Sequence, residues 1–305
     1  MDRDGLVVGI GGVGSRLAAE AARTLRLECV VVSADESDRV PGHRFIHIKC
    51  GAPANPSVHH IRGAAQPALK DLESVSNGFD TVLLVANLAG RTGAALAPMV
   101  SGAFAGRHLA SFVVMPFGYE EDRLFQAGIA LARIRKDSHS TVILDNDSIL
   151  ECNPDLSVDS CYEAGNGALA GIMGSLGRAT LAGDCVVSAG PESRDVDKSM
   201  RDSIKMLYGT APPHSVKHSV LYMSGSVPVG VVESVSRLTR GITDAPVAVV
   251  TGASSRSGVV LVSATDALAK FEGYDPLSVI PGDRTLDWEE PERSVNADLG
   301  LYQLE

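Results

Sequence analysis

The sequence predicts an α/β protein in which a parallel sheet with crossover helices is followed by a long connecting helix and a smaller α/β domain. Three observations support this prediction. Short apolar runs alternate with helical periodicity in the first half of the chain, a glycine-rich turn follows the first run, and a long alanine-rich segment precedes a second set of strands. With 45% hydrophobic residues over 305 positions, the chain can bury more core than one typical domain holds.

Six apolar runs bounded by Gly, Asp, Asn or Pro are predicted as the strands of a first domain at residues 1–158. They cover residues 5–10, 29–35, 44–49, 81–88, 110–117 and 140–147. Their alternation with helical segments predicts a parallel sheet. Ligands bind beyond the carboxyl ends of the strands in such sheets, so the residues that follow each run are candidate site residues.

The second half begins with a predicted central connecting helix at residues 159–182, which is apolar on nearly all sides, as a helix between two domains is. Residues 183–275 are predicted as a C-terminal α/β domain, and residues 276–305 as an acidic tail. The elements expected in the C-terminal domain are helices over residues 193–208 and 228–242 and strands over residues 218–225, 246–252 and 257–264.

The composition argues against several classes of protein. A formal net charge of −10 disfavours binding to nucleic acid. No apolar run reaches the roughly 18 residues of a membrane span, and the N-terminus lacks signal-peptide features, so we expect a cytoplasmic protein. The five cysteines are scattered without CxxC spacing, which argues against a disulfide framework. No metal site is predicted, because His59 and His60 also lack matching ligands.

Two glycine-rich loops each link a predicted strand to a predicted helix. They contribute Gly11, Gly12 and Gly14 after the first strand, and Gly90, Thr92 and Gly93 after the fourth. Backbone N–H groups and helix dipoles would converge there on a phosphate, which predicts a Rossmann-like nucleotide-binding domain. The first loop alone suits a dinucleotide enzyme, an adenylating enzyme or a GTP-binding protein, and a turn that only packs a helix on the sheet is the plain alternative.

The second loop, AGRTGAALAP at residues 89–98, resembles the GGGTGTG and AAP signature of the tubulin and FtsZ superfamily. It keeps the threonine, the flanking glycines and the proline, but carries Arg91 where a small residue is usual. The resemblance continues in order through VVGIGGVGSR, VVSAD, GAPANPSV, MPFGYEEDR, LDNDSIL and YEAGNGAL. The chain therefore resembles a divergent FtsZ-like protein, with an archaeal source left open, and the resemblance implies the tubulin/FtsZ fold.

The resemblance implies a site for GTP or GDP, with Mg²⁺ accompanying the nucleotide. Glu120, or alternatively Glu121, would contact the ribose, and Arg123 would lie near the phosphates or the sugar. Asn146 would read the guanine edge, Tyr162 would stack on the base, and Asn166 would hydrogen-bond it. The full set of implied contacts is Gly11, Gly12, Val13, Gly14, Ser15, Asp35, Ala52, Asn55, Gly90, Arg91, Thr92, Gly93, Glu120, Arg123, Asn146, Tyr162 and Asn166.

Two departures from the family pattern concern selectivity and hydrolysis. Gly167 stands where an aspartate usually reads guanine, so we expect poor base selectivity. In the family the next subunit completes hydrolysis, and the resemblance implies Glu192 and Asp195 as the catalytic acids, with Gly190 in place of an asparagine. Helix capping alone would also explain these carboxylates. With the bulky Arg91, we expect slow or absent GTP hydrolysis.

The function implied is that of a guanine-nucleotide-binding cytoskeletal protein of cell division. It would associate head to tail with itself, as a filament or dimer, or with another FtsZ-like protein, and its tail would dock adaptors. One alternative is a nucleotide-free structural or regulatory paralogue, a pseudo-GTPase. A lesser alternative is an adenylating enzyme of the ubiquitin-activating type, but HRFIHIKCGAPANP offers neither the asparagine and arginine pair nor the CxxC motifs of those enzymes.

Overall fold

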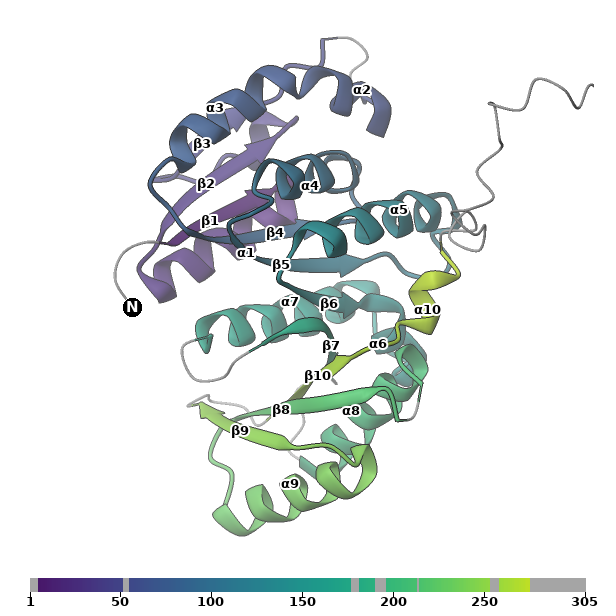
Figure 1. Ribbon diagram of the computed structural model, residues 1–305. Coiled ribbons are helices and arrows are strands. Elements are labelled where there is room, and N and C mark those ends of the chain that lie inside the picture. The colour runs from purple at the N-terminus through teal and green to yellow at the C-terminus, as the bar shows by residue number, and fades with distance from the viewer. Residues whose placement is uncertain are drawn as a thin grey trace, which may run out of the picture.

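The computed structural model describes residues 5–51, 55–176, 181–189, 196–212, 214–252 and 258–274 (Figure 1). Within these residues ten strands form one sheet, in the order β3-β2-β1-β4-β5-β6-β7-β10-β8-β9. The strands are β1 (Gly5–Ile10), β2 (Glu28–Ser33), β3 (Arg44–His47), β4 (Thr81–Asn87), β5 (His108–Met115), β6 (Ser140–Asp145), β7 (Gly183–Ala189), β8 (Val216–Ser224), β9 (Val247–Gly252) and β10 (Gly258–Thr265). The helices are α1 (Gly11–Leu25), η1 (Glu36–Asp38), α2 (Val58–Ala64), α3 (Gln66–Ser76), α4 (Arg91–Ala103), α5 (Glu121–Asp137), α6 (Asn146–Cys152), α7 (Val158–Gly174), α8 (Val196–Thr210), α9 (Val229–Thr243) and α10 (Ala269–Glu272).

Strands β1 to β6 run parallel, which confirms the architecture predicted for the first half of the chain. Every residue of β1 and of β6 is buried, because both faces of a parallel sheet are covered by helices. The last residues of several apolar runs leave the strands and form the loops at the carboxyl edge. Asn146 and Asp147, for example, begin helix α6.

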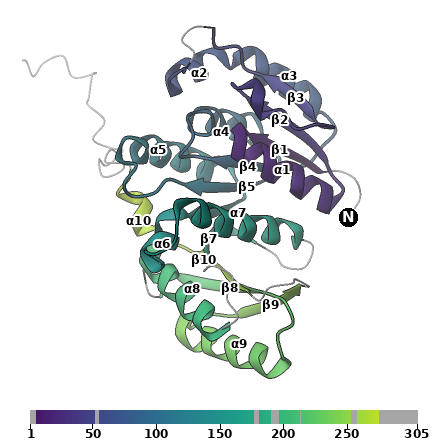
Figure 2. The same cartoon turned by 180° about the vertical axis from the view of Figure 1, so that it is seen from behind.

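Successive side chains of the parallel strands enter two separate cores. Helices α2, α3, α4 and α5 cover one face, where Val8 and Leu84 are buried. Helices α1 and α7 cover the other face, where Val7 and Val85 are buried. Figure 2 shows α1 and α7 side by side on this second face. The starts of α1 and α4 therefore approach the carboxyl edge from opposite faces of the sheet.

The central helix α7 is shorter than the sequence predicts. It ends at Gly174, and Ser175 and Leu176 form a turn in which the Ser175 N–H bonds to Ile172 O. The prediction of helix up to residue 182 is wrong at this end, since residues 181 and 182 are not helical. Glycine at positions 171 and 174 weakens helix propensity near the observed end.

The C-terminal half continues the same sheet instead of forming a separate one. Strand β7, which the sequence analysis did not identify, pairs parallel with β6 and antiparallel with β10. Helices α8 and α9 pack together on one face of β8 and β10. The two helices and three strands predicted in this half are present within three residues of their expected limits. The predicted tail, residues 276–305, lies outside the described residues.

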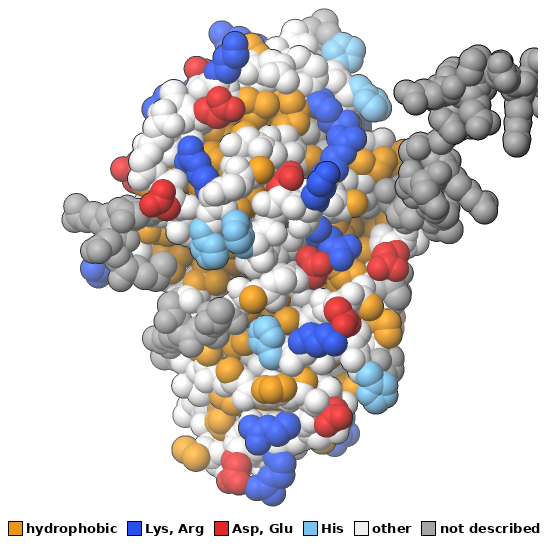
Figure 3. Space-filling view, viewed as in Figure 1, with side chains coloured by type: hydrophobic (Ala, Val, Ile, Leu, Met, Phe, Trp, Pro, Cys, Tyr) orange, Lys and Arg blue, Asp and Glu red, His pale blue; other side chains and the backbone are white. Residues whose placement is uncertain are grey.

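The surface charges and the cysteine thiols do not point to a particular chemistry. Both signs of charge occur on the upper and the lower part of the face in Figure 3. The five cysteines are free thiols, with Cys29, Cys161 and Cys185 buried and the other two half-buried. Among the described residues, no helix combines the length and the apolar character that a membrane crossing requires.

Candidate functional site

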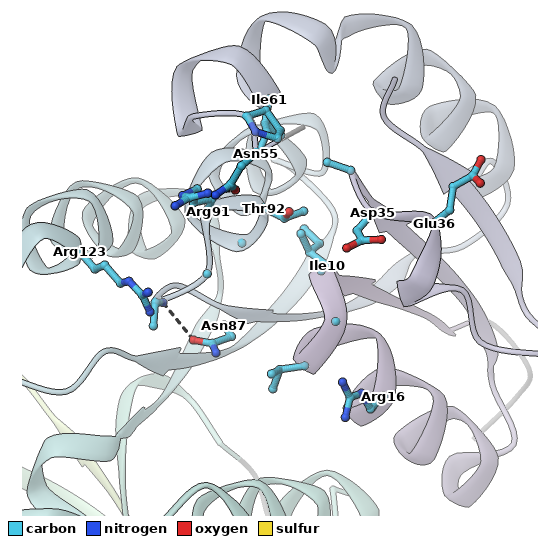
Figure 4. Close-up of a pocket in the computed structure, with 18 of the residues that line it drawn as sticks. Ile10, Arg16, Asp35, Glu36, Asn55, Ile61, Asn87, Arg91, Thr92 and Arg123 are labelled. Carbon is cyan, nitrogen blue, oxygen red and sulfur yellow. Dashed lines mark hydrogen bonds between the residues drawn. The ribbon is translucent and has the colours of Figure 1, made fainter. Parts of the chain in front are cut away.

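A pocket of about 750 Å³ opens at the carboxyl edge of the parallel sheet, where β1, β2 and β4 end (Figure 4). Its volume lies in the range of small-molecule sites. Ten of the predicted contact residues line it: Gly11, Gly12, Val13, Asp35, Asn55, Gly90, Arg91, Thr92, Gly93 and Arg123. The structure thus brings the two glycine-rich loops together in one cavity.

The starts of helices α1 and α4 meet in this pocket. Helix α1 begins at Gly11 and α4 at Arg91, and neither has a side-chain cap or an acidic residue in its first turn. A Cβ on Gly11 would lie only 3.3 Å from Thr92 Cβ, so the two helix starts are in contact. The first-turn N–H groups of both helices therefore lack side-chain acceptors, and the two positive dipole ends face one cavity. This arrangement can bind an anion such as a phosphate.

The glycines of the two loops serve different purposes. A Cβ on Gly93 would lie 1.9 Å from Asn87 O, and one on Gly14 would lie 2.5 Å from Val85 O, so both positions allow a helix to pack on β4. Gly11 has a φ of +67°, a left-handed backbone that favours glycine. Gly90 has space around it, since a Cβ there would meet only Asn87 O at 3.4 Å. Helix packing alone, the plain alternative, explains Gly14 and Gly93 but not the open site at Gly90.

Three arginines place positive charge on the pocket. Arg91, the first residue of α4, donates a hydrogen bond from Nη1 to Asn55 Oδ1. Arg123 pairs with Glu120 Oε1 at 2.5 Å, and Glu120 Oε2 accepts the Phe117 N–H at 3.1 Å. Arg16 extends from α1. Glu120 therefore does not line the pocket itself; it holds Arg123 at the pocket wall.

Acidic and neutral groups from β2 and β3 form the opposite wall, which Figure 4 shows around Asp35 and Glu36. Asp35 accepts the Ser37 N–H at 2.9 Å, and this bond is the main reason that the pKa of Asp35 lies below its usual value. Glu36 lies 3.4 Å from His47 Nδ1. Both carboxylates on this wall thus have partners within the chain.

The residues expected to read the base do not line the pocket. Asn146 is only 1% exposed, and its Nδ2 donates to Met115 O at 3.1 Å. Its Oδ1 is buried and has no hydrogen-bond partner among the described residues. Asn166 is half-buried on α7, and Gly167 beside it is exposed with open space around it. Asn146 is the first residue of α6, and its side chain points into the protein toward Met115 O.

Two tyrosines pack on Phe117, next to the Glu120 and Arg123 pair. Tyr162 packs edge-on against the buried Phe117, with ring centroids 5.3 Å apart. Tyr119, which the sequence analysis did not single out, stacks on the same Phe117 and is 61% exposed. Burial raises the pKa of Tyr162, and Glu120 and Tyr119 raise it further. Tyr162 thus lies in the electrostatic range of the Glu120 and Arg123 pair, although it does not reach the pocket.

Several other predicted residues cannot contact a ligand in this conformation or are not described. Gly14 and Ser15 are buried inside α1, and Ser15 Oγ has no hydrogen-bond partner among the described residues. Ala52, Glu192 and Asp195 lie outside the described residues, as does Gly190.

The sequence analysis did not predict four polar residues that line the pocket: Arg16, Glu36, His47 and Asn87. His47 and Asn87 are the last residues of β3 and β4. The rule that ligands bind beyond strand ends could have identified them. Elsewhere in the part of the chain that is described, no group of three or more His, Cys, Asp or Glu side chains has metal-site geometry.

An ion cluster next to Asn146 anchors the C-terminal segment. Lys270 Nζ lies 2.8 Å from Asp145 Oδ2 and 3.0 Å from Asp147 Oδ2, and the Asp145 side chain is fully buried. Desolvation alone would lower the pKa of Lys270, but the two aspartates outweigh it and raise that pKa. Asp147 Oδ1 also accepts the Gly118 N–H at 2.8 Å. Helix α10 is therefore connected to the loop that carries Tyr119 and Glu120.

Comparison with known proteins gives a family match and several related sequences. Residues 47–154 match the GTPase domain of the tubulin/FtsZ family. Cell division protein FtsZ 1 of Thermococcus kodakarensis is 25% identical over 170 residues, which are 52% of this chain and 45% of that protein. FtsZ 2 of Methanocaldococcus jannaschii is 26% identical over 179 residues, 54% of this chain and 46% of that protein. The chain spans about half the length of these curated relatives.

Solved structures extend the likeness over most of the chain. An FtsZ mutant of M. jannaschii matches with a TM-score of 0.69 and 17% identity, covering 87% of this chain and 91% of the other. CetZ2 from Haloferax volcanii, solved as a GTPγS-bound protofilament, matches with a TM-score of 0.65 and 17% identity, covering 89% and 96%. These structures share the fold, and the family match supplies the sequence relationship. Residues 47–154 thus match the tubulin/FtsZ GTPase domain in sequence, and the chain as a whole shares the fold of the FtsZ and CetZ structures.

Proposed function

We propose that the chain binds a guanine nucleotide, GTP or GDP, with the phosphates across the starts of α1 and α4. The observation that carries this proposal is the contact between two helix N-termini that lack side-chain caps inside one 750 Å³ pocket. Phosphate would accept hydrogen bonds from the backbone N–H groups of both first turns. Gly12 and Gly90 allow the backbone to approach the phosphates, and the Thr92 side chain lies beside Gly11.

Arg123 would bind the sugar or a phosphate, with Glu120 holding it in place through their ion pair. Asp35 and Glu36 supply the carboxylate oxygens of the pocket wall, which are the groups that would hold a Mg²⁺ ion if the nucleotide carried one. The base would extend toward Tyr162 and Asn166. With Asn146 turned inward and Gly167 lacking a side chain, binding would depend mainly on the phosphates.

We propose further that hydrolysis is slow or absent and that copies of the chain associate head to tail as a cytoplasmic cytoskeletal protein of cell division. The sequence match to FtsZ proteins supports this proposal, as does the fold shared with a protein solved as a protofilament. Glu192 and Asp195 remain proposed as the catalytic acids that one copy would contribute to the nucleotide site of the neighbouring copy. Adaptor binding through residues 276–305 stays a proposal as well.

The direct test is the nucleotide content of the purified protein, followed by titration of the emptied protein with GDP. Gly12→Leu should abolish retention, because a Cβ there would lie 2.6 Å from Asp38 Oδ1 and would displace the start of α1 that lines the pocket. Gly241→Leu, on α9 with open space around it, is the matched control and should bind normally. Equal nucleotide occupancy in wild type and Gly12→Leu would show that the nucleotide does not bind in this pocket.

A nucleotide-free paralogue is the second candidate, and one observation favours it. Arg91 already bonds to Asn55 within the pocket, so its side chain takes up space that a small residue would leave free. A wild-type protein that holds no nucleotide and binds none in titration would support this alternative over the first proposal.

A further inference from the structure

We propose that Arg91 is the ligand of the terminal phosphate and supplies the positive charge that a divalent cation would otherwise provide, so that nucleotide binds without Mg²⁺. This inference rests on the proposed function of the same pocket and specifies how that pocket neutralises its ligand.

Arg91 occupies an unusual electrostatic position. It is the first residue of α4, where the helix dipole is positive, and a cation there is unfavourable unless an anion lies nearby. The first turns of α4 and of the adjacent α1 contain no acidic residue. Within the described part of the chain, no carboxylate lies at ion-pair distance from Arg91, whereas the neighbouring Arg123 is paired with Glu120. On the α4 side of the cavity, the guanidinium and the two dipole ends thus have no carboxylate partner among the described residues, and the carboxylates of the cavity, Asp35 and Glu36, lie on the opposite wall.

Among the described residues, the one hydrogen-bond partner of the Arg91 side chain is neutral and leaves most of the guanidinium available. Only Nη1 of Arg91 is engaged, by Asn55 Oδ1, and both residues line the pocket. Figure 4 shows the two side chains pointing toward each other beside Thr92. A guanidinium has five N–H donors in a planar fork, so the remaining donors can bind a phosphate bidentately. The bond to Asn55 fixes the side chain and reduces the entropy that is lost on binding.

The carboxylates of the opposite wall are already engaged. Asp35 accepts the Ser37 N–H, and Glu36 lies beside His47. A metal ion bridging phosphate and this wall would have to compete with both contacts, whereas Arg91 needs no rearrangement of a carboxylate. A terminal phosphate would be neutralised by Arg91 on the α4 side of the pocket.

The experiment is calorimetric titration of the full chain with GDP and with the slowly hydrolysed analogue GTPγS, each in EDTA and in Mg²⁺. Wild type should bind GTPγS in EDTA within about threefold of its affinity in Mg²⁺. Arg91→Ala should lose about tenfold to a hundredfold of GTPγS affinity in EDTA, because a charge-assisted contact is removed, and less for GDP. Arg91→Lys should recover part of the loss, since it keeps the charge without the fork.

Arg201→Ala, an exposed arginine on α8, is the matched control and should bind as wild type does. Unchanged melting temperatures would show that each variant is folded. Tighter binding by Arg91→Ala would mean that Arg91 occludes the pocket, and wild-type binding that requires Mg²⁺ would mean that the metal is needed. Either result overturns the inference and leaves the proposed function standing. If wild type binds neither nucleotide in either buffer, the proposed function fails and the inference fails with it.

Discussion

The two sides of the candidate site differ in how they are built. On the side proposed to bind phosphate (the phosphate side), the starts of α1 and α4 face an open pocket through backbone groups and glycines. On the side proposed to bind the base (the base side), Asn146 is turned into the core and Tyr162 packs on Phe117. Backbone recognition of phosphate requires only a conformation, which many sequences can provide. Recognition of a base requires particular side chains, so it is more easily lost while the fold persists.

The largest expected effect comes from the ion cluster that supports the base side. Lys270→Met should lower the free energy of unfolding by about 3–5 kcal/mol, because it leaves the fully buried Asp145 without its cation. Urea unfolding measures this change. Lys217→Met, which breaks the exposed pair with Asp266, is the control and should cost less than about 1 kcal/mol. Equal costs would show that Lys270 is not tightly held.

A smaller loss is expected from a methyl group on the phosphate side. Gly93→Ala should destabilise the protein by about 2–3 kcal/mol, since the added Cβ would lie 1.9 Å from Asn87 O in the present backbone. Gly171→Ala on α7 has open space and should be neutral or slightly stabilising. Thermal unfolding compares the two. A Gly93→Ala protein as stable as wild type would show that α4 does not approach β4 so closely.

The base side can be tested by restoring an acidic group. Gly167→Asp should raise the preference for GTP over ATP by about tenfold, because a carboxylate beside Asn166 can accept the N–H groups of guanine. Gly171→Asp, one helical turn further along α7 and also in open space, should leave the preference unchanged. Competition binding measures both ratios. A preference that moves equally in both variants would place the base elsewhere.

The smallest expected effect is on the stability of the fold at low pH. The burial of Asp147 raises its pKa, but the Gly118 N–H and Lys270 outweigh this and hold the pKa below its usual value. A carboxyl whose pKa is lowered on folding contributes stability above its unfolded pKa of about 3.9, and that stability is lost as the pH falls through the lower, folded value. Glu151, whose pKa burial raises, works in the opposite direction at slightly higher pH.

We therefore expect Asp147→Asn to flatten the fall in stability below about pH 4, measured by urea unfolding at several pH values. The matched variant Asp155→Asn, in the loop before α7, should keep the wild-type slope. Identical slopes in wild type and Asp147→Asn would contradict the assignment.

Much of the parallel half of the fold could be predicted because buried strands such as Gly5–Ile10 are continuous apolar runs that end in glycine or polar residues. Strand β7 was missed because its short apolar run directly follows an apolar segment predicted as helix, and such runs fit either structure. The two glycine-rich loops of the pocket could be predicted because glycine at positions such as 11 and 93 meets a backbone requirement.

Other parts of the site depend on tertiary packing. Whether Asn146 faces a ligand or Met115 O is decided by how α6 sits on β5, and no local sequence pattern encodes that choice. Arg16 reaches the pocket because of the direction of α1, and the sequence shows it only as a polar residue in a helix. The same holds for Lys270, whose partners lie more than a hundred residues away in the chain.

The pairing of β6 with β7 has a mechanical consequence. Five residue pairs, from Ser140 with Gly183 to Leu144 with Val187, join the two halves of the molecule through backbone hydrogen bonds. Swinging one half about the other as on a hinge would shear this ladder, so the halves resist independent rotation. Torsion applied to the strands beside the pocket, β1, β2 and β4, would instead be transmitted through the continuous sheet toward β9.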